Sequence, residues 1–173
     1  MTDRRSFLLS GSVLMGSAAL GNVLTAFAAA PRKATFFTEA ELTTLRVLVD
    51  LILPATDSPS ASAADTHYFI DLAIPACASD AAQKTFRSGL RELASQNFAA
   101  AKSVTQIALL KSRAAADMTP DYDQSFFKIL KDYTLTGYFL GEIGATQALA
   151  YERVPGGFWG DLPLQPGQKA WAI

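Results

Sequence analysis

A chain of 173 residues and 18.5 kDa can form one packed domain, but it is too short to hold a dinucleotide-binding core together with a substrate domain. Half of the residues are apolar, 18% are charged and the net charge is −1. This composition excludes a charged disordered tail and a protein that binds nucleic acid by electrostatic attraction. One histidine and one cysteine cannot form a structural zinc site, a haem-attachment motif or a Cys–His catalytic pair unless distant carboxylates contribute.

The N-terminus carries an adjacent pair of arginines, Arg4 and Arg5, followed by Phe7 and Leu8 at the start of an uncharged stretch. This pattern is typical of a twin-arginine signal peptide, in which the cationic end stays at the inner leaflet while a weakly apolar segment inserts. The twin-arginine (Tat) translocase carries proteins that have already folded. We therefore predict that residues 1–30 are a signal peptide that exports the folded chain to the periplasm.

Small side chains at Ala26, Ala28 and Ala30 are suited to a signal peptidase, so cleavage is expected after Ala28 or Ala30. The alternative is a retained membrane anchor, because no charged residue occurs between Arg5 and Arg32 and a span needs only about 20 residues. The many glycine, serine and alanine residues make this stretch a poor permanent span, which favours cleavage.

Residues 31–173 are predicted to form a single all-α domain with an irregular tail from about residue 151. Apolar residues recur with the 3.6-residue period of a helix, and no stretch alternates convincingly with period two. The first helix is expected to begin after Thr38, which forms a capping box with Glu41, and to stop before Pro54.

The later helices are predicted from caps and apolar stripes. A short helix that includes His67 runs toward Pro75, another begins after Ser79, and a weaker alanine-rich helix covers residues 104–116. The last long helix is expected to restart at Thr119, with a proline at its first helical position. Its core side is predicted to carry Tyr122, Phe126, Ile129, Leu130 and Tyr133.

Small residues gather after this helix, at Gly137, Gly141, Gly144 and Ala145. Their spacing puts them on one side of a helix or a helix–turn, so either a neighbouring helix of the same chain or the flat surface of a partner could approach closely.

Beyond Tyr151, proline and glycine exclude a regular helix, yet the tail carries Phe158 and Trp159. Such a tail either folds back over its own bundle or lies in a groove of another subunit, where aromatic side chains supply much of the contact energy. The predicted partner interface consists of Gly137, Tyr138, Gly141, Tyr151, Phe158 and Trp159.

Isolated polar residues leave alternatives open. The carboxylates Asp50, Asp57, Asp71 and Glu142 could act as acids, bases or metal ligands, but Asp57 fits a turn and Glu142 fits a buried acceptor of backbone hydrogen bonds. A lone histidine such as His67 is more often a structural hydrogen-bonding group than a catalyst. An independent small periplasmic enzyme that uses His67 is therefore an alternative reading.

Three further side chains are ambiguous. Cys77 cannot form an intrachain disulfide, so it is either a buried small hydrophobe, which we favour, or one half of a bridge to a partner. Lys131 and Arg153 could pair with acidic groups of a partner, although solvated charges are the usual case.

Several motifs occur in a fixed order along the chain: I-L-P-x-T-D at 52–57, F-I-D at 69–71, F-F-x-x-L-K at 126–131, G-Y-F at 137–139 and E-I-G-A-T-Q at 142–147. With these motifs, roughly residues 36–160 resemble the gluconate 2-dehydrogenase subunit 3 family. The resemblance implies a non-catalytic small subunit with no catalytic residue, cofactor or metal of its own.

The same resemblance implies the partners. The larger subunit would be a flavoprotein of the glucose-methanol-choline (GMC) oxidoreductase type, which holds FAD and oxidises a sugar, glycoside, sugar acid or polyol. A cytochrome c subunit with haem c commonly takes the electrons. The small subunit would carry the export signal for the complex, which would be periplasmic and membrane-associated through its other subunits. The remaining alternative is a membrane-anchored scaffolding protein with an uncleaved N-terminus.

Overall fold

The computed structural model describes residues 34–117, 121–152, 156–157, 163 and 165–172. The predicted signal peptide, with its arginine pair and cleavage region, lies outside these residues. Within the described ranges, no helix combines the length and apolar character that a membrane span requires. The described residues all belong to the predicted mature domain, residues 31–173.

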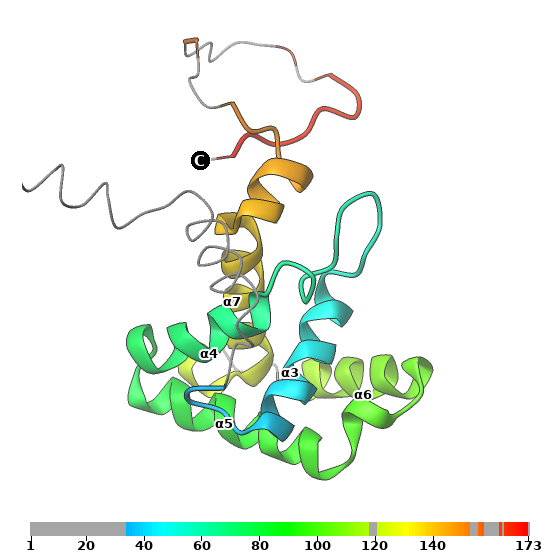
Figure 1. Cartoon of the computed structure of the whole chain (residues 1–173). Coiled ribbons are helices and arrows are strands. Elements are labelled where there is room, and N and C mark those ends of the chain that lie inside the picture. Colours follow the sequence, from blue (N-terminus) through cyan, green and yellow to red (C-terminus); the bar gives the residue numbers. More distant parts are fainter. Residues whose placement is uncertain (1–33, 118–120, 153–155, 158–162, 164, 173) are drawn as a thin grey trace, which may run out of the picture. The chain divides into compact units, whose positions relative to one another are not determined.

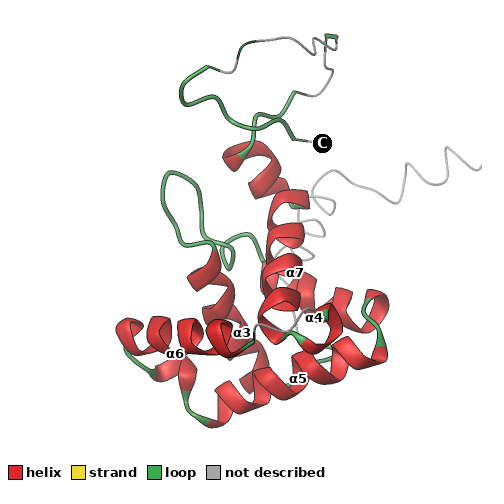
Figure 2. Ribbon diagram, turned by 180° about the vertical axis from the view of Figure 1, so that it is seen from behind, coloured by secondary structure: helices red, strands yellow, loops and turns green. Residues whose placement is uncertain are grey.

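The described residues form helices joined by turns and loops, including a long loop between α3 and α4 (Figures 1 and 2). The long helices are α3 (Glu39–Ile52), α4 (Thr66–Cys77), α5 (Asp80–Ser95), α6 (Ser103–Ala116) and α7 (Phe126–Leu140). Short turns are η1 (Phe98–Ala100), η2 (Tyr122–Gln124) and the π-helical η3 (Gly144–Ala148). The described part of the chain has no β-strand, only one isolated bridge between Ala150 and Trp171. The predicted all-α class is confirmed.

The capping box predicted for α3 is present. The Thr38 hydroxyl accepts from the Glu41 backbone N–H at 3.3 Å, and the Thr38 N–H donates to the Glu41 carboxylate at 2.7 Å. Glu41 is buried, and its second oxygen accepts from Arg91 of α5 at 2.8 Å. Burial raises the pKa of Glu41, but the bonds from Thr38 and Arg91 and the nearby Arg87 outweigh it and lower the pKa overall. The same carboxylate thus caps α3 and ties it to α5.

Helix α4 extends further than the sequence predicts. It passes through Pro75 and ends at Cys77, where the N–H of Ala78 donates to the carbonyl of Ile74. Proline lacks an N–H, so the backbone bond that residue 75 would make to the carbonyl of Asp71 is missing, and the proline ring crowds that carbonyl. Pro75 lies in the last turn, and the helix ends two residues later at Cys77.

The start of the last long helix also differs from the prediction. Helix α7 begins at Phe126, after the N-cap Ser125, whose hydroxyl accepts from the Lys128 N–H at 3.2 Å. Asp117, at the end of α6, accepts from the Ser125 hydroxyl at 3.0 Å and from the Phe127 N–H at 2.7 Å. These bonds supply the capping groups at residue 125. The predicted N-cap Thr119 lies outside the described residues.

Between α6 and α7 the chain forms the short turn η2 instead of a first helical turn. Asp121 is its N-cap and accepts from the Asp123 N–H at 3.1 Å. As a result Tyr122 is exposed and does not join the core, contrary to the prediction. Phe126, Ile129 and Leu130 are buried as predicted, and Tyr133 is half-buried.

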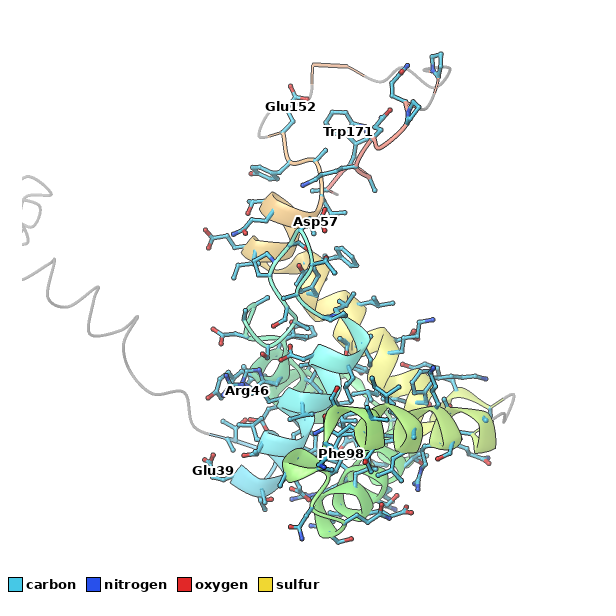
Figure 3. All side chains as sticks on the ribbon, turned by 90° about the vertical axis from the view of Figure 1, so that its right-hand side faces the viewer. Glu39, Arg46, Asp57, Phe98, Glu152 and Trp171 are labelled. Atoms are coloured by element: carbon cyan, nitrogen blue, oxygen red, sulfur yellow. The ribbon has the colours of Figure 1, made fainter. Side chains whose placement is uncertain are left out.

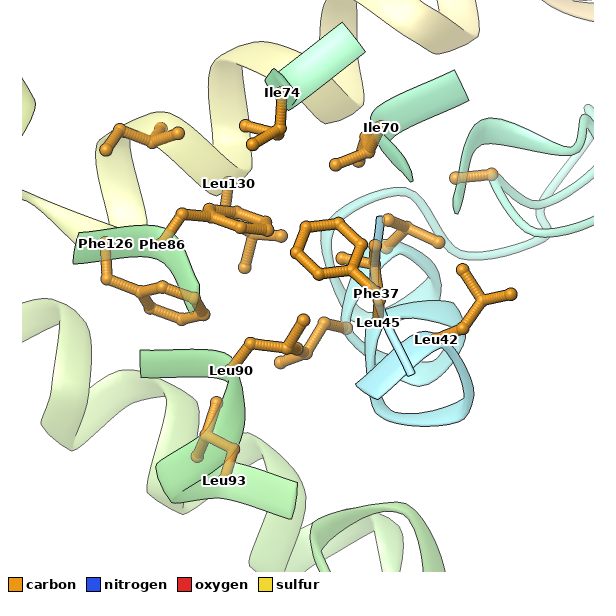
Figure 4. Packing of buried hydrophobic residues seen from close by; sticks show 14 of the residues in the cluster. Phe37, Leu42, Leu45, Ile70, Ile74, Phe86, Leu90, Leu93, Phe126 and Leu130 are labelled. Atoms are coloured by element: carbon orange, nitrogen blue, oxygen red, sulfur yellow. The ribbon is translucent and has the colours of Figure 1, made fainter. Parts of the chain in front are cut away.

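One apolar core joins α3, α4, α5 and α7 (Figure 4). Phe37 comes from the segment before α3 and points into this core, with its ring 5.7 Å from that of Phe86 on α5. Phe86 in turn lies 5.4 Å from Phe126 at the start of α7. Complete burial of each large apolar side chain contributes about 2 kcal/mol. On α5 the side chains of Phe86, Leu90 and Leu93 are all buried in this core.

The segment before α3 is held by one buried carboxylate. Asp71 of α4 accepts from the N–H and the hydroxyl of Thr35, both at 2.6 Å. Its other oxygen accepts from the N–H groups of Phe36 at 3.0 Å and Phe37 at 2.7 Å. Burial raises the pKa of Asp71, but these hydrogen bonds outweigh it and lower the pKa below its ordinary value of 3.8. Asp71 therefore acts as a structural anchor in its ionised form.

Replacing Asp71 should destabilise the domain. Asp71→Ala is expected to lower the free energy of unfolding by about 3 kcal/mol, because backbone donors that the carboxylate satisfied lose their partner. Urea unfolding followed by circular dichroism measures the change. Asp57→Ala is the matched control, because Asp57 is exposed, and it should change the free energy by less than about 0.5 kcal/mol. Equal losses in both variants would contradict the anchoring role.

The same carboxylate should make stability depend on pH in the acid range. Its pKa in the folded chain lies below its ordinary value of 3.8, so its contribution is complete above that pH and is lost as the pH falls through the lowered pKa. In Asp71→Asn this part of the acid destabilisation should disappear. Unfolding curves between pH 2 and pH 6 test this expectation, and identical pH profiles for the two proteins would contradict it.

Candidate partner-binding surface

Two of the small residues in and after the last turn of α7 pack closely inside the chain. A Cβ atom at Gly137 would collide with the ring of Phe69 on α4, and one at Gly144 would collide with the backbone carbonyl of Tyr138. Tyr138 is 2% exposed, and its hydroxyl donates to the carbonyl of Pro59 at 2.7 Å. Of the two readings of these small residues, packing within the chain is the one that the structure shows at Gly137 and Gly144.

This packing corrects part of the predicted interface. Gly137 and Tyr138 are buried in the chain's own fold, so their side-chain positions do not face a partner. Gly141 is half-buried and follows the end of α7, whereas Tyr151 is 58% exposed. Phe158 and Trp159 lie outside the described residues. Only Tyr151 is therefore seen as an exposed aromatic group among the predicted residues.

The end of the chain comes back to pair with Ala150, just after η3. The N–H of Ala150 donates to the carbonyl of Ala170 at 2.8 Å, and the N–H of Ala172 donates to the carbonyl of Ala150 at 2.9 Å. Lys169 adds a bond from its ammonium group to the carbonyl of Gln147 at 2.6 Å. Trp171, in this closing segment, is 61% exposed (Figure 3). The tail is thus fixed at residues 150 and 170–172 and presents aromatic side chains to the outside there.

The candidate catalytic residues come from different elements, except His67 and Asp71, which lie one turn apart on α4. Asp50 accepts from the N–H and the hydroxyl of Ser62, and Asp57 lies on an exposed bend beyond α3 (Figure 3). Glu142 is exposed, so the predicted buried acceptor is wrong. His67 is buried and stacks against Tyr68, with ring centres 4.3 Å apart. Within the described residues, no group of three histidine, cysteine or acidic side chains could hold a metal ion.

Cys77 is exposed, which corrects the expectation that it is buried. It ends α4 close to Tyr133 of α7, whose pKa is raised by burial and by the neighbouring cysteine. The sequence did not indicate that this helix ends beyond Pro75, and the prediction for Cys77 failed for that reason. Because α4 continues past Pro75, its last turn and Cys77 extend beyond the core.

An apolar groove between α3, α6 and α7 was not predicted from the sequence. It has a volume of about 310 Å³ and is lined by Leu51 and Ile52 of α3, Ile107 and Leu110 of α6, and Phe127 of α7. Lys131, which we singled out as a possible contact for acidic groups, also lines it. The only sequence signal was the weak helix predicted over residues 104–116, on which Ile107 is 42% exposed.

The comparison with known families decides where the chain belongs. The family model described as Gluconate 2-dehydrogenase subunit 3 matches residues 39–156, which is more than half of the chain. The chain belongs to the gluconate 2-dehydrogenase subunit 3 family. No curated protein and no solved structure matches it.

Family membership confirms the resemblance carried by the sequence motifs and makes this chain a subunit of a dehydrogenase complex. The match begins at the first residue of α3 and extends beyond η3, so it includes every described helix. The closing segment with Trp171 follows the matched region. The gluconate 2-dehydrogenase subunit 3 homology therefore includes both the groove and the packed end of α7.

The tight packing after α7 predicts strong sensitivity at Gly144. Gly144→Ala should lower the free energy of unfolding by about 2 kcal/mol, because the added methyl group meets a backbone carbonyl that cannot move aside. Gly156→Ala is the control, since nothing lies within 4 Å of a Cβ atom there, and it should be nearly neutral. Thermal unfolding of both variants measures the difference. A stable Gly144→Ala protein would show that η3 can rearrange.

The exposure of Cys77 predicts a reactive thiol in the folded protein. A chromogenic disulfide reagent should modify one thiol per chain at a rate close to that in denaturant, because the side chain is accessible before unfolding. Absorbance of the released thiolate follows the reaction. Modification that occurs only after unfolding would contradict this placement.

Proposed function

We propose that this chain is the non-catalytic escort subunit of an exported, FAD-dependent dehydrogenase complex. The observation that carries the proposal is the family match over residues 39–156 in a chain that begins with the Arg4–Arg5 pair of a twin-arginine signal. The family match indicates a dehydrogenase subunit, and the arginine pair indicates transport of a folded protein. Together they favour a small subunit that takes a folded, flavin-loaded partner through the Tat translocase.

The roles of three carboxylates fit this proposal. Asp71 binds the backbone of residues 35–37, and Glu41 caps α3 and pairs with Arg91. Asp117 caps α7 through Ser125 and Phe127. Each of these carboxylates stabilises the fold of the small subunit. These structural roles support the proposal that the partner carries out the oxidation.

The partner proposed is a flavoprotein of the GMC type, several times larger than this chain, that holds FAD and oxidises a sugar, glycoside, sugar acid or polyol. A cytochrome c subunit with haem c would receive the electrons. The complex would lie in the periplasm and associate with the membrane through its other subunits. The substrate would be selected by the pocket of the flavoprotein, since this chain supplies stability and export.

Affinity purification of the tagged full-length chain from its native periplasm and membranes tests the proposal. We expect the eluate to show flavin absorbance and a much larger flavoprotein in stoichiometric amount by mass spectrometry. The isolated chain should have no dehydrogenase activity. A colourless chain without a large partner would contradict the proposal, as would a catalytic activity of the isolated chain that is lost in His67→Ala.

The export role predicts a specific effect of the arginine pair. In Arg4→Lys/Arg5→Lys, periplasmic dehydrogenase activity should fall about tenfold or more while the complex still forms in the cytoplasm, because the translocase reads the paired arginines. Arg32→Lys is the matched control and should leave export unchanged. Activity and the flavoprotein itself are measured in both fractions. An unchanged periplasmic level of the flavoprotein would show that it is exported without this chain.

A further inference from the structure

Helix α6 leaves part of its own apolar surface exposed. Among its apolar side chains, Leu110 is 8% exposed, whereas Ile107 is 42% and Val104 is 80% exposed. Ile107 lines the groove, and Val104 lies one helical turn before it, so the apolar surface continues from the groove along α6. Contiguous apolar surface of this kind on a soluble domain marks an interaction site.

The opposite walls of the groove are also apolar and partly open. Leu51 and Ile52 occupy the last turn of α3, and Phe127 occupies the first turn of α7. All three are half-buried. A segment inserted here would cover side chains from three helices at once, which is how an apolar segment binds in a groove between helices.

The charge of the groove is positive. Lys111 of α6 and Lys131 of α7 line it, and both are exposed. In the described part of the chain neither lysine has an ion-pair partner, and none of the residues that line the groove carries a carboxylate. The complementary ligand therefore combines apolar side chains with at least one carboxylate.

We propose that this groove binds an apolar, carboxylate-bearing segment of the large flavin-binding subunit. This inference rests on the proposed function and identifies where the partner docks. A protein segment fits better than a free fatty acid, because the apolar surface extends out of the groove to Val104. The two lysines come from different helices, so they would contact carboxylates at separate positions along the segment.

Reversing the two groove charges tests the docking site. In Lys111→Glu/Lys131→Glu the Kd of the purified complex should rise about tenfold or more, because the carboxylates of the segment then meet like charges. The control Arg46→Glu/Lys84→Glu changes the net charge equally at exposed basic residues outside the groove, and it should alter the Kd less than about twofold. Sedimentation of a dilution series, detected by flavin absorbance, measures the Kd, and thermal unfolding should show that both variants fold as the wild type does.

Photo-crosslinking identifies the occupant. With p-benzoylphenylalanine in place of Ile107, the cross-linked peptide should come from the large subunit and contain apolar residues with an aspartate or glutamate. The same probe in place of Lys84 should give no such product. Cross-links to a bound lipid or to a second copy of this chain would overturn the inference.

The two proposals fail in different ways. A charge-reversed groove that leaves the Kd unchanged overturns the docking site but leaves the escort function standing. A wild-type chain that purifies without any flavoprotein overturns the escort function, and the docking site falls with it.

Discussion

The ionised carboxylate of Asp71 is the interaction on which the remaining packing depends. It holds the N–H groups of residues 35–37 against α4, and this places Phe37 in the core beside Phe86. Phe86 also packs against Phe126 at the start of α7. The same segment leads directly into the capping box of α3. A single buried charge thus sets where the folded domain begins and how its first helix enters the bundle.

The inner and outer surfaces of the domain use charge differently. Buried carboxylates are satisfied by backbone donors or by arginine, as at Asp71 and Glu41, and so they stabilise one conformation. The groove at α6 shows the opposite arrangement, with apolar walls and two exposed lysines that have no acidic neighbour in its lining. This contrast supports the proposal that the groove binds another protein. Membership of the gluconate 2-dehydrogenase subunit 3 family agrees with this proposal.

Residues close together in the sequence predicted much of the fold. Where the structure differs from the prediction, contacts between residues far apart in the sequence are the cause. The capping box at Thr38 and the cap at Ser79 depend on residues close in sequence, so they could be predicted. The start of α7 could not, because Asp117 supplies bonds across the turn. The exposure of Cys77 depends on how α4 passes Pro75. The groove could not be predicted because it forms only when three helices pack together. Lys131, which lines it, was nevertheless predicted as a possible contact for acidic groups of a partner.

The pairing of Ala150 with residues 170–172 converts the C-terminal tail into a closed ring. Closing a loop of about 20 residues costs about 2.5 kcal/mol of chain entropy relative to the open chain. Here that cost is met within the folded chain, before any partner arrives. Tyr151 and Trp171 are thus exposed on backbone that is already fixed at residues 150 and 170–172, so ordering them for a contact costs less entropy than it would on an open chain.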